Sequence, residues 1–398
     1  MSAIHEARLK LRAELEAPPT LRRFGSGWIS GVLGLVLGLA GLLLIISFRA
    51  PGTFSMPELG PLRSSPWFRF GLHALLLVAF GSSAISLVLR RGKLLGSVGI
   101  ATTLIAALLG GSQATALVPD PTPLFLGLDW FVLNVLFTGF LFIPLERIFP
   151  KWPEQSLFRE EWREDIFYYL VSSLMVQVLT VLSFSPAQSL VAVAPLAAVR
   201  AWVGGLPFLV QFVAIMMLTD LFQYWVHRAF HRIPWLWKFH AVHHSARSMD
   251  WIAGARMHFL EIIALRSITV IPMLALGFSG IVVNCYIFVV YLYSTFIHAN
   301  VSWRFSILEK FFVTPRFHHW HHGIEDAAID VNFAIHFPWL DRLFGTYHLP
   351  EDHWPVGYGV QGHPVPPGYL AQFGYPFRGE KTTIPPTSSK SNDQPLTT

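Results

Sequence analysis

The segment that decides the fold runs from residue 206 to residue 244 and reads LPFLVQFVAIMMLTDLFQYWVHRAFHRIPWLWKFHAVHH. Its first part, Leu206 to Val226, is apolar. It is long enough to cross a hydrocarbon core of about 30 Å, which takes roughly 20 helical residues. The same helix continues to His227 and His231, which are four residues apart and therefore share one face. The stretch predicts a membrane span that ends in a chelating pair of imidazoles.

Composition indicates a membrane protein along most of the chain, because 53% of the residues are hydrophobic and only 13% are charged. The run near Trp28 is too long for a cleaved secretory signal, so we expect a retained span there. The chain is predicted to be an all-α, polytopic bundle. Its further spans are expected at Trp28 to Phe48, Trp67 to Leu89, Leu94 to Leu117, Leu126 to Leu145, Ile166 to Phe184, and Ile262 to Ile297, where two short spans turn near Gly277 to Gly280.

The positions of lysine and arginine predict the orientation, since cytoplasmic loops are enriched in both. The N-terminal arm, Arg90 to Lys93 and Arg147 to Arg163 carry them, whereas the loop Val118 to Pro123 has none. We therefore expect a multi-pass protein with its N-terminus and its histidine clusters in the cytoplasm. The net charge of +5 fits inside loops that meet anionic headgroups. No basic groove with interleaved aromatic residues is present, so nucleic acid is not expected as a partner.

The chain is predicted to have three parts. Residues 1–150 form an N-terminal region of about four spans, and residues 151–360 form a catalytic region with fourteen of the seventeen histidines. Residues 361–398 form a tail, which is rich in Pro, Ser and Thr from Lys381 onward and is expected to be disordered. Cys285 is the only cysteine, which excludes an internal disulfide and a cysteine-rich metal site.

Two further histidine clusters repeat the helical spacing of the first. His240, His243 and His244 stand at positions i, i+3 and i+4, and the same spacing returns later in the chain. The later cluster consists of His318, His321 and His322, with Thr314 as the expected N-cap and Pro315 at the first helical position. His319 falls on another face of that helix. The spacing predicts two short helices that enclose a metal pair together with the first.

Neutral imidazole suits such a site because it offers a nitrogen to iron, zinc or copper at about 2.1 Å without bringing a formal charge to the membrane. We expect the clusters to form a histidine-rich helical cap with a dimetal site. Asp220, Asp330 and Asn332 are predicted to orient the rings, with helix capping or turn formation as the competing role for the last two. His336, His348 and His353 are expected at the surface or in satisfied interfacial positions.

The three clusters resemble the histidine boxes of the fatty acid hydroxylase and sterol desaturase superfamily of membrane diiron enzymes. The likeness extends through Arg256-x-His258, His298-Ala-Asn300 and Asp330-x-Asn332, and it covers roughly residues 140 to 350. It implies two iron ions, O2 as co-substrate and two electrons from an external donor. It also implies His298 as a further ligand and His258 as a weaker candidate.

The resemblance implies an oxidoreductase that hydroxylates or desaturates a fatty acyl, sterol, sphingoid or ether lipid. Both reactions begin with the same hydrogen abstraction, so the sequence leaves them open. No His-Pro-Gly-Gly signature of a fused cytochrome b5 is present, so a separate cytochrome b5-like or ferredoxin-like donor is expected. We expect lipid to arrive laterally between Leu206–Val226 and Ile262–Ile297. The four N-terminal spans lie outside the likeness. They keep open an alternative, a non-catalytic membrane transporter or sensor that binds metal or haem.

Overall fold

The computed structural model describes residues 3–117, 124–193, 196–351 and 353–378. The backbone of these residues forms helices and no named strand, with isolated bridges joining Pro150 to Val301 and Gly323 to Tyr358. The prediction of an all-α protein is therefore confirmed. The loop Val118 to Pro123 and the tail from Lys381, both used in the sequence analysis, lie outside the described residues.

Seven helical segments of the described chain are long and apolar enough to span a membrane, judged by length and composition. They match the predicted spans closely, so the polytopic bundle is confirmed. They are α2 (Trp28–Arg49), α5 (Pro66–Leu89), Leu94–Gln113 (α6, Leu94–Leu108, extended by η3, Gly111–Gln113), α7 (Leu128–Ile148), α11 (Phe208–Arg232), α13 (Phe259–Leu276) and α14 (Gly280–His298).

The span predicted over Ile166 to Phe184 is a bent pair of helices, α8 (Trp162–Leu174) and α9 (Val176–Val193), with a 63° angle between them. A backbone segment at Gly127 contacts the bend and hydrogen-bonds to it. The Leu174 carbonyl accepts from Gly127 N–H at 3.2 Å, and a Cβ at Gly127 would lie 2.7 Å from the Ser173 carbonyl oxygen. Backbone groups freed at the break thus find partners at a position that only glycine can occupy.

The chain divides into two compact units. Unit 1 extends to Phe137 and includes Ser173–Gln177, while unit 2 contains Thr138–Ser172 and the chain from Val178 onward. This division is close to the predicted boundary at residue 150, but the independence of the two parts stays a prediction.

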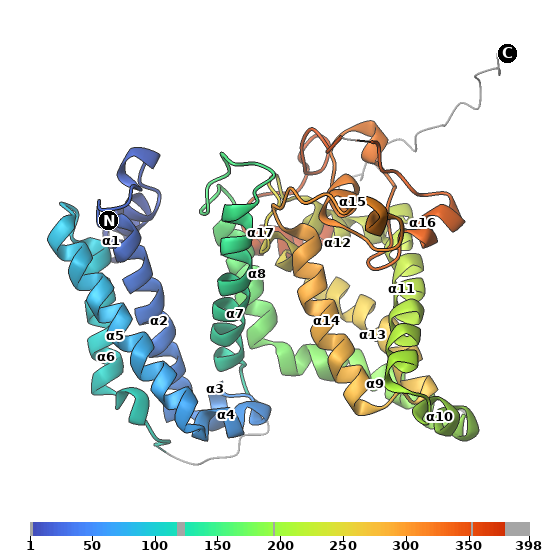
Figure 1. Ribbon diagram of the computed structural model, residues 1–398, viewed down its shortest axis with the longest axis horizontal. Coiled ribbons are helices and arrows are strands. Elements are labelled where there is room, and N and C mark those ends of the chain that lie inside the picture. Colours follow the sequence, from blue (N-terminus) through green and yellow to red (C-terminus); the bar gives the residue numbers. More distant parts are fainter. Residues whose placement is uncertain (1–2, 118–123, 194–195, 352, 379–398) are drawn as a thin grey trace. The chain divides into compact units, whose positions relative to one another are not determined.

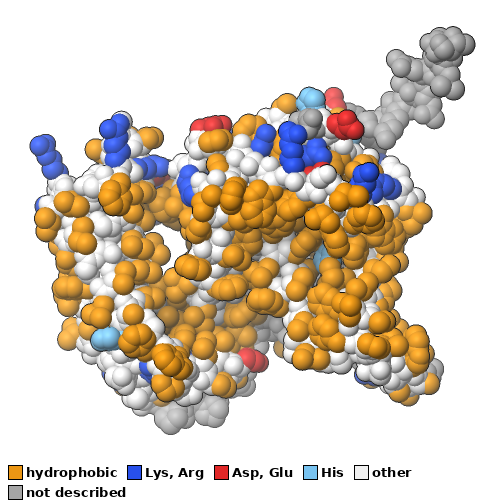
Figure 2. Space-filling model, in the orientation of Figure 1, with side chains coloured by type: hydrophobic (Ala, Val, Ile, Leu, Met, Phe, Trp, Pro, Cys, Tyr) orange, Lys and Arg blue, Asp and Glu red, His pale blue; other side chains and the backbone are white. Residues whose placement is uncertain are grey.

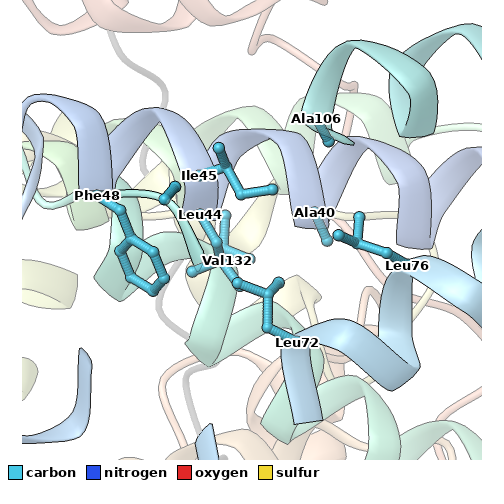
Figure 3. Packing of buried hydrophobic residues seen from close by; sticks show 9 residues of the cluster. Ala40, Leu44, Ile45, Phe48, Leu72, Leu76, Ala106 and Val132 are labelled. Atoms are coloured by element: carbon cyan, nitrogen blue, oxygen red, sulfur yellow. The ribbon is translucent and has the colours of Figure 1, made fainter. Parts of the chain in front are cut away.

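In unit 1, α2 packs against α5 and α6 through small residues. A Cβ added at Gly34 would lie 2.1 Å from Ser83 Oγ, and one at Gly38 would lie 2.5 Å from Thr102 Oγ1. Such close approach gives extensive van der Waals contact where no hydrophobic effect drives helices together. Towards the other end of α2, larger side chains fill the interface, as Figure 3 shows for Ala40, Leu44, Ile45, Phe48, Leu72, Leu76, Ala106 and Val132.

Short elements complete unit 1. They are α1 (Ala3–Leu15), η1 (Pro19–Leu21), α3 (Pro51–Phe54), η2 (Pro57–Leu59) and α4 (Gly60–Ser64). Glu14 of α1 pairs with Arg90 after α5, which ties the N-terminal helix to the bundle.

In unit 2 the apolar helices α11, α13 and α14 bear a cap of short helices at one end, where α12, α15 and α16 gather (Figure 1). Figure 2 shows Lys and Arg side chains on this cap and hydrophobic side chains on the flank of α11 and α14. The short elements are α10 (Ala197–Gly204), α12 (Pro234–His244), η4 (Ala253–Ala255), η5 (Ser306–Lys310), α15 (Pro315–His321), η6 (Asp326–Ala328), α16 (Trp339–Phe344), α17 (Tyr369–Gly374) and η7 (Tyr375–Phe377). The ordered structure therefore continues past the predicted start of the tail at residue 361.

Buried charges fix the loops of the cap. Arg159 Nε donates to Asp250 at 2.7 Å, and Arg159 also pairs with Asp165. Arg256 Nε donates to the other oxygen of Asp165 at 2.5 Å. Because the carboxylates surround each guanidinium, the pKa of Arg159 and of Arg256 is raised although burial alone would lower it. The loops around 159 and 250–256 are thereby held together behind α12.

Candidate metal centre

Nine buried histidines form two groups whose ligand nitrogens lie within 4.8 Å of one another in each group. Group A consists of His227, His231, His240, His244 and His321, and group B consists of His243, His298, His318 and His322. These nine are the histidines expected from the sequence and from the resemblance. Their distribution mixes the clusters, because α12 and α15 each contribute to both groups.

The local structure explains how each ring is delivered. Helix α11 carries His227 and His231 one turn apart. Helix α15 begins as predicted, with Pro315 at its first position and Thr314 Oγ1 accepting from Phe317 N–H at 3.4 Å. His298 is the last residue of α14. Four helix ends thus converge on one region of the cap.

In group A the Nε2 atoms face one another. His227 Nε2 lies 2.9 Å from His240 Nε2. His244 Nε2 lies 3.1 Å from the Nε2 atoms of both His240 and His321. His231 Nε2 is buried and has no hydrogen-bond partner among the described residues.

Group B repeats the arrangement. His298 Nε2 lies 3.4 Å from His243 Nε2 and 3.1 Å from His318 Nε2. His322 Nε2 lies 3.2 Å from His318 Nε2. All four side chains are buried.

The partner of the other ring nitrogen, Nδ1, shows which nitrogen of each ring carries the proton. In four of the rings it faces a main-chain carbonyl oxygen, which only accepts, so Nδ1 carries the proton and Nε2 presents a lone pair. These pairs are His227 with Phe333 at 2.9 Å, His321 with Val331 at 2.8 Å, His243 with Arg256 at 3.0 Å and His298 with Ser294 at 2.6 Å.

In the contact between His243 and His298 both rings are of this kind, so two lone pairs face each other at 3.4 Å and repel unless a cation lies between them. A metal about 2.1 Å from two nitrogens at a right angle separates those nitrogens by roughly 3.0 Å, which is the spacing found in both groups. The donor set of each group therefore fits a metal ion.

Protonation of the rings agrees with this reading. Burial lowers the pKa of the α12 and α15 histidines of both groups well below the ordinary value, and the neighbouring imidazoles lower it further. This holds for His240, His243, His244, His318, His321 and His322. The rings are neutral near pH 7, which is the form that binds a metal.

Two carboxylates reach the rings of group A. Glu261 in the first turn of α13 has Oε1 2.5 Å from His240 Nδ1, and Asp330 has Oδ1 3.5 Å from His231 Nδ1. Asp330 was expected near the rings, but Glu261 was missed. A lone acid at the start of an apolar span was the available signal, since an ionisable residue there needs a partner.

Asp220 and Asn332 act on the backbone and contact none of the nine imidazoles. Asp220 accepts from the N–H groups of Ile335, His336 and Phe337 at 2.8, 3.1 and 2.8 Å, which pins this loop to α11. The amide of Asn332 binds the backbone of Phe317 and His348. Asp220 and Asn332 can therefore orient the rings only indirectly, through the backbone that they hold in place.

The loop that contains Asp330 and Asn332 nevertheless contacts group A through its main chain. Both residues have a φ of +59°, a left-handed conformation that Asp and Asn tolerate. The carbonyls of Val331 and Phe333, beside these turns, are the acceptors for His321 and His227. Sequence reasoning had no signal for them, because any residue supplies a carbonyl.

Other histidines stand apart from both groups. His319 Nδ1 lies 2.8 Å from the Tyr358 hydroxyl, and its Nε2 lies 3.3 Å from the His298 carbonyl oxygen. His258 caps α13 and contacts the Phe373 carbonyl oxygen at 3.0 Å. His336 corrects an expectation: it is buried rather than superficial, and neither ring nitrogen has a hydrogen-bond partner among the described residues. Burial lowers the pKa of His336 to about 4.

A small pocket with about 40 Å³ of free space adjoins group A. Its walls include His231, His244 and His321, and Asp330 lies among them. This volume holds one or two water molecules.

Comparison with known proteins adds to this geometry. The family model for fatty acid hydroxylase matches residues 212–346, a range that contains all nine histidines. The ornithine lipid hydroxylase OlsE of Rhizobium tropici is 30% identical over 264 residues, which cover 64% of this chain and 78% of that protein. The chain belongs to the fatty acid hydroxylase family. Human alkylglycerol monooxygenase is 31% identical over 147 residues, which cover 37% of this chain and 32% of that protein. No solved structure matches the chain.

Membership of the fatty acid hydroxylase family confirms the predicted class of enzyme, a membrane-bound lipid oxygenase and thus an oxidoreductase. The named relatives are a hydroxylase and a monooxygenase, which favours the enzyme over the non-catalytic transporter or sensor that the sequence left open. The region matched by the family model begins after α10, so the four N-terminal spans remain outside it.

Proposed function

We propose that groups A and B each hold one iron ion and that the protein uses them to oxygenate a membrane lipid with O2 and two external electrons. The observation that carries this proposal is the convergence of nine buried imidazoles, six of which have Nδ1 engaged by a main-chain carbonyl or a carboxyl group. Iron is one of the metals that imidazole nitrogen binds well. When bound, the iron pair supplies the activation of O2 and the removal of hydrogen from an unactivated C–H bond.

The protein's own contribution is positioning and exclusion of water. Each of the nine histidines is at most 6% exposed, so the ligand sphere is sealed from solvent on most sides. Carbonyl acceptors hold four rings in the tautomer that directs Nε2 inward. The carboxyl groups of Glu261 and Asp330 lie against the Nδ1 atoms of two rings of group A. The two proposed metal positions therefore differ in ligand number, with five imidazoles in group A and four in group B.

For hydroxylation, the C–H bond, O2, two electrons and two protons yield an alcohol and water. For desaturation, two hydrogens leave the chain and two waters form. The named relatives act on ornithine lipid and alkylglycerol, so we propose a membrane lipid with a polar headgroup as the substrate. It approaches laterally between α11 and the α13–α14 pair. Electrons come from a separate cytochrome b5-like or ferredoxin-like donor.

We also propose that the cap and the N-terminus face the cytoplasm, as the distribution of lysine and arginine indicates. Single cysteines at Ser245 and Val356 test this in a variant without Cys285. Labelling of intact cells by an impermeant maleimide should require permeabilisation at both positions. Labelling without permeabilisation would reverse the topology.

The main test uses the purified full chain in lipid nanodiscs. Elemental analysis should find about two irons per chain. Lipid from cells that express the chain should gain one oxygen, or lose two hydrogens if desaturation occurs, relative to cells that express the His240→Ala variant. One zinc or one haem per chain, with unchanged lipids, would contradict the proposal.

A further inference from the structure

A cluster of exposed apolar side chains lies on the cap, outside the spanning helices. It is formed by η5 with the residues after it and by α16. Ile307 is 63% exposed, Phe311 is 57% exposed and Leu343 is 66% exposed. Leu308 and Phe312 complete the set, which we name the rim patch: Ile307, Leu308, Phe311, Phe312 and Leu343. Large apolar side chains gathered in this way mark an interaction surface.

The two segments of the rim patch form one surface. Arg342 Nη1 donates to the Lys310 carbonyl at 2.7 Å, which joins α16 to the end of η5. The rings of Phe312 and Phe337 also lie 6.0 Å apart, just before α16 begins. The rim patch is therefore a fixed feature of the cap.

The charges around the rim patch have one sign. Within residues 303–312 and 339–344 the exposed charged residues are Arg304, Lys310 and Arg342. The two acids of these segments, Glu309 and Asp341, are buried, and Glu309 pairs with Arg316 at 2.5 Å. An apolar surface bordered by basic side chains is complementary to anionic lipid headgroups over acyl chains.

The rim patch also continues the lipid-facing side of α11. Phe344 of α16 packs against Trp225, with ring centroids 4.8 Å apart, and its carbonyl accepts from Arg228 Nη1 at 3.4 Å. Trp225 is 48% exposed, and the Arg228 guanidinium lies over its ring at 5.6 Å. An exposed Trp with Arg beside it is typical of the membrane–water boundary. Figure 2 shows hydrophobic side chains extending along this flank up to the basic side chains of the cap.

From these observations we propose that the rim patch inserts into the adjoining leaflet and binds anionic lipid headgroups through Lys310 and Arg342. The bilayer then covers η5 and α16 as well as the spanning helices. The segment after η5 leads directly to Thr314, the N-cap of α15, so the lipid-bound surface adjoins the helix that carries His318 of group B and His321 of group A. Insertion of the rim patch requires neither the metal nor catalysis.

The test places an environment-sensitive fluorophore at single cysteines of the full chain without Cys285, reconstituted in vesicles of phosphatidylcholine and phosphatidylglycerol. One variant is Phe311→Cys. The matched control is Val356→Cys, because Val356 is an apolar cap residue that is 81% exposed and lies beside Glu325, which accepts from its N–H. Circular dichroism and the melting temperature establish that both variants fold.

We expect the label at 311 to emit at shorter wavelength, to be quenched by doxyl-labelled lipid and to be protected from iodide. The label at 356 should show the opposite behaviour. Protection from iodide without quenching by lipid would indicate coverage by a protein or by a second copy, and this would overturn the proposal. Equal access of iodide to both labels would also overturn it.

The headgroup part has its own measurement. Quenching at 311 by doxyl-phosphatidylglycerol should exceed quenching by doxyl-phosphatidylcholine at equal amounts. The double substitution Lys310→Gln and Arg342→Gln should remove that difference while the label remains lipid-quenched. If the difference survives in the double variant, the two basic residues do not bind the headgroup.

Discussion

Helix α15 offers a sharp separation of ligand from bystander, because His319 and His321 are both buried on the same short helix. His321 Nε2 points into group A, 3.1 Å from His244 Nε2, and its Nδ1 contacts the Val331 carbonyl. Replacement of His321 by Ala removes one of the five nitrogens of group A. Loss of an outer partner alone typically weakens metal binding by 10- to 100-fold, so loss of a ligand should weaken it by more than about 100-fold.

The His319→Ala variant tests the same depth of burial without loss of a ligand. It removes the contacts to the Tyr358 hydroxyl and the His298 carbonyl and leaves a cavity. With roughly 1 kcal/mol per hydrogen bond and a similar amount for the cavity, we expect a loss of about 3 kcal/mol in the free energy of unfolding. Tyr358 keeps a partner, since Trp152 Nε1 donates to it at 3.2 Å. The iron should therefore remain.

The assay is iron content per folded chain in nanodiscs, together with the melting temperature of each variant. His321→Ala should lose most of the group A iron, whereas His319→Ala should keep nearly all of it and melt at lower temperature. His319→Gln should recover part of the lost stability, because its amide can renew one hydrogen bond. Equal loss of iron from folded His319→Ala and His321→Ala would refute the assignment of faces on α15.

Three further outcomes are expected. Glu261→Leu should weaken iron binding by about 10- to 100-fold, because His240 loses the acceptor that fixes its tautomer, and Glu261→Gln should weaken it less. Iron titration of both variants measures this difference. Equal effects of the two substitutions would exclude the hydrogen bond as the cause. Asp220→Ala should lower the free energy of unfolding by about 3 kcal/mol or more, because three N–H groups of the 335–337 loop lose their acceptor. Asp220→Asn should lower the free energy of unfolding by less, and denaturant unfolding in detergent compares the two variants. Removal of residues 1–125 should leave both iron sites formed, because no histidine of group A or group B lies in that segment. Loss of both irons from a truncated chain with native helix content would contradict the three-part division.

Local periodicity in the sequence was enough to predict much of this protein. The apolar runs predicted the spanning helices, since helix length and side-chain hydrophobicity suffice in a bilayer where every backbone group must bond internally. The i, i+3 and i+4 spacing placed imidazoles on common helical faces, and Thr314 with Pro315 predicted the start of α15. Each of these features depends on residues within one or two turns of each other.

Tertiary structure alone decided how the nine histidines are divided between groups A and B. His243 and His244 are adjacent in α12 yet enter different groups, because the partners that complete each group come from α11, α14 and α15. The groups that accept hydrogen bonds from Nδ1 of these rings could not be predicted from the sequence either. Glu261 lies 21 residues from His240, and the Val331 and Phe333 carbonyls are aimed by left-handed turns at Asp330 and Asn332. A hydrogen bond depends on the position of atoms brought together from distant segments, and main-chain carbonyls leave no mark on residue type.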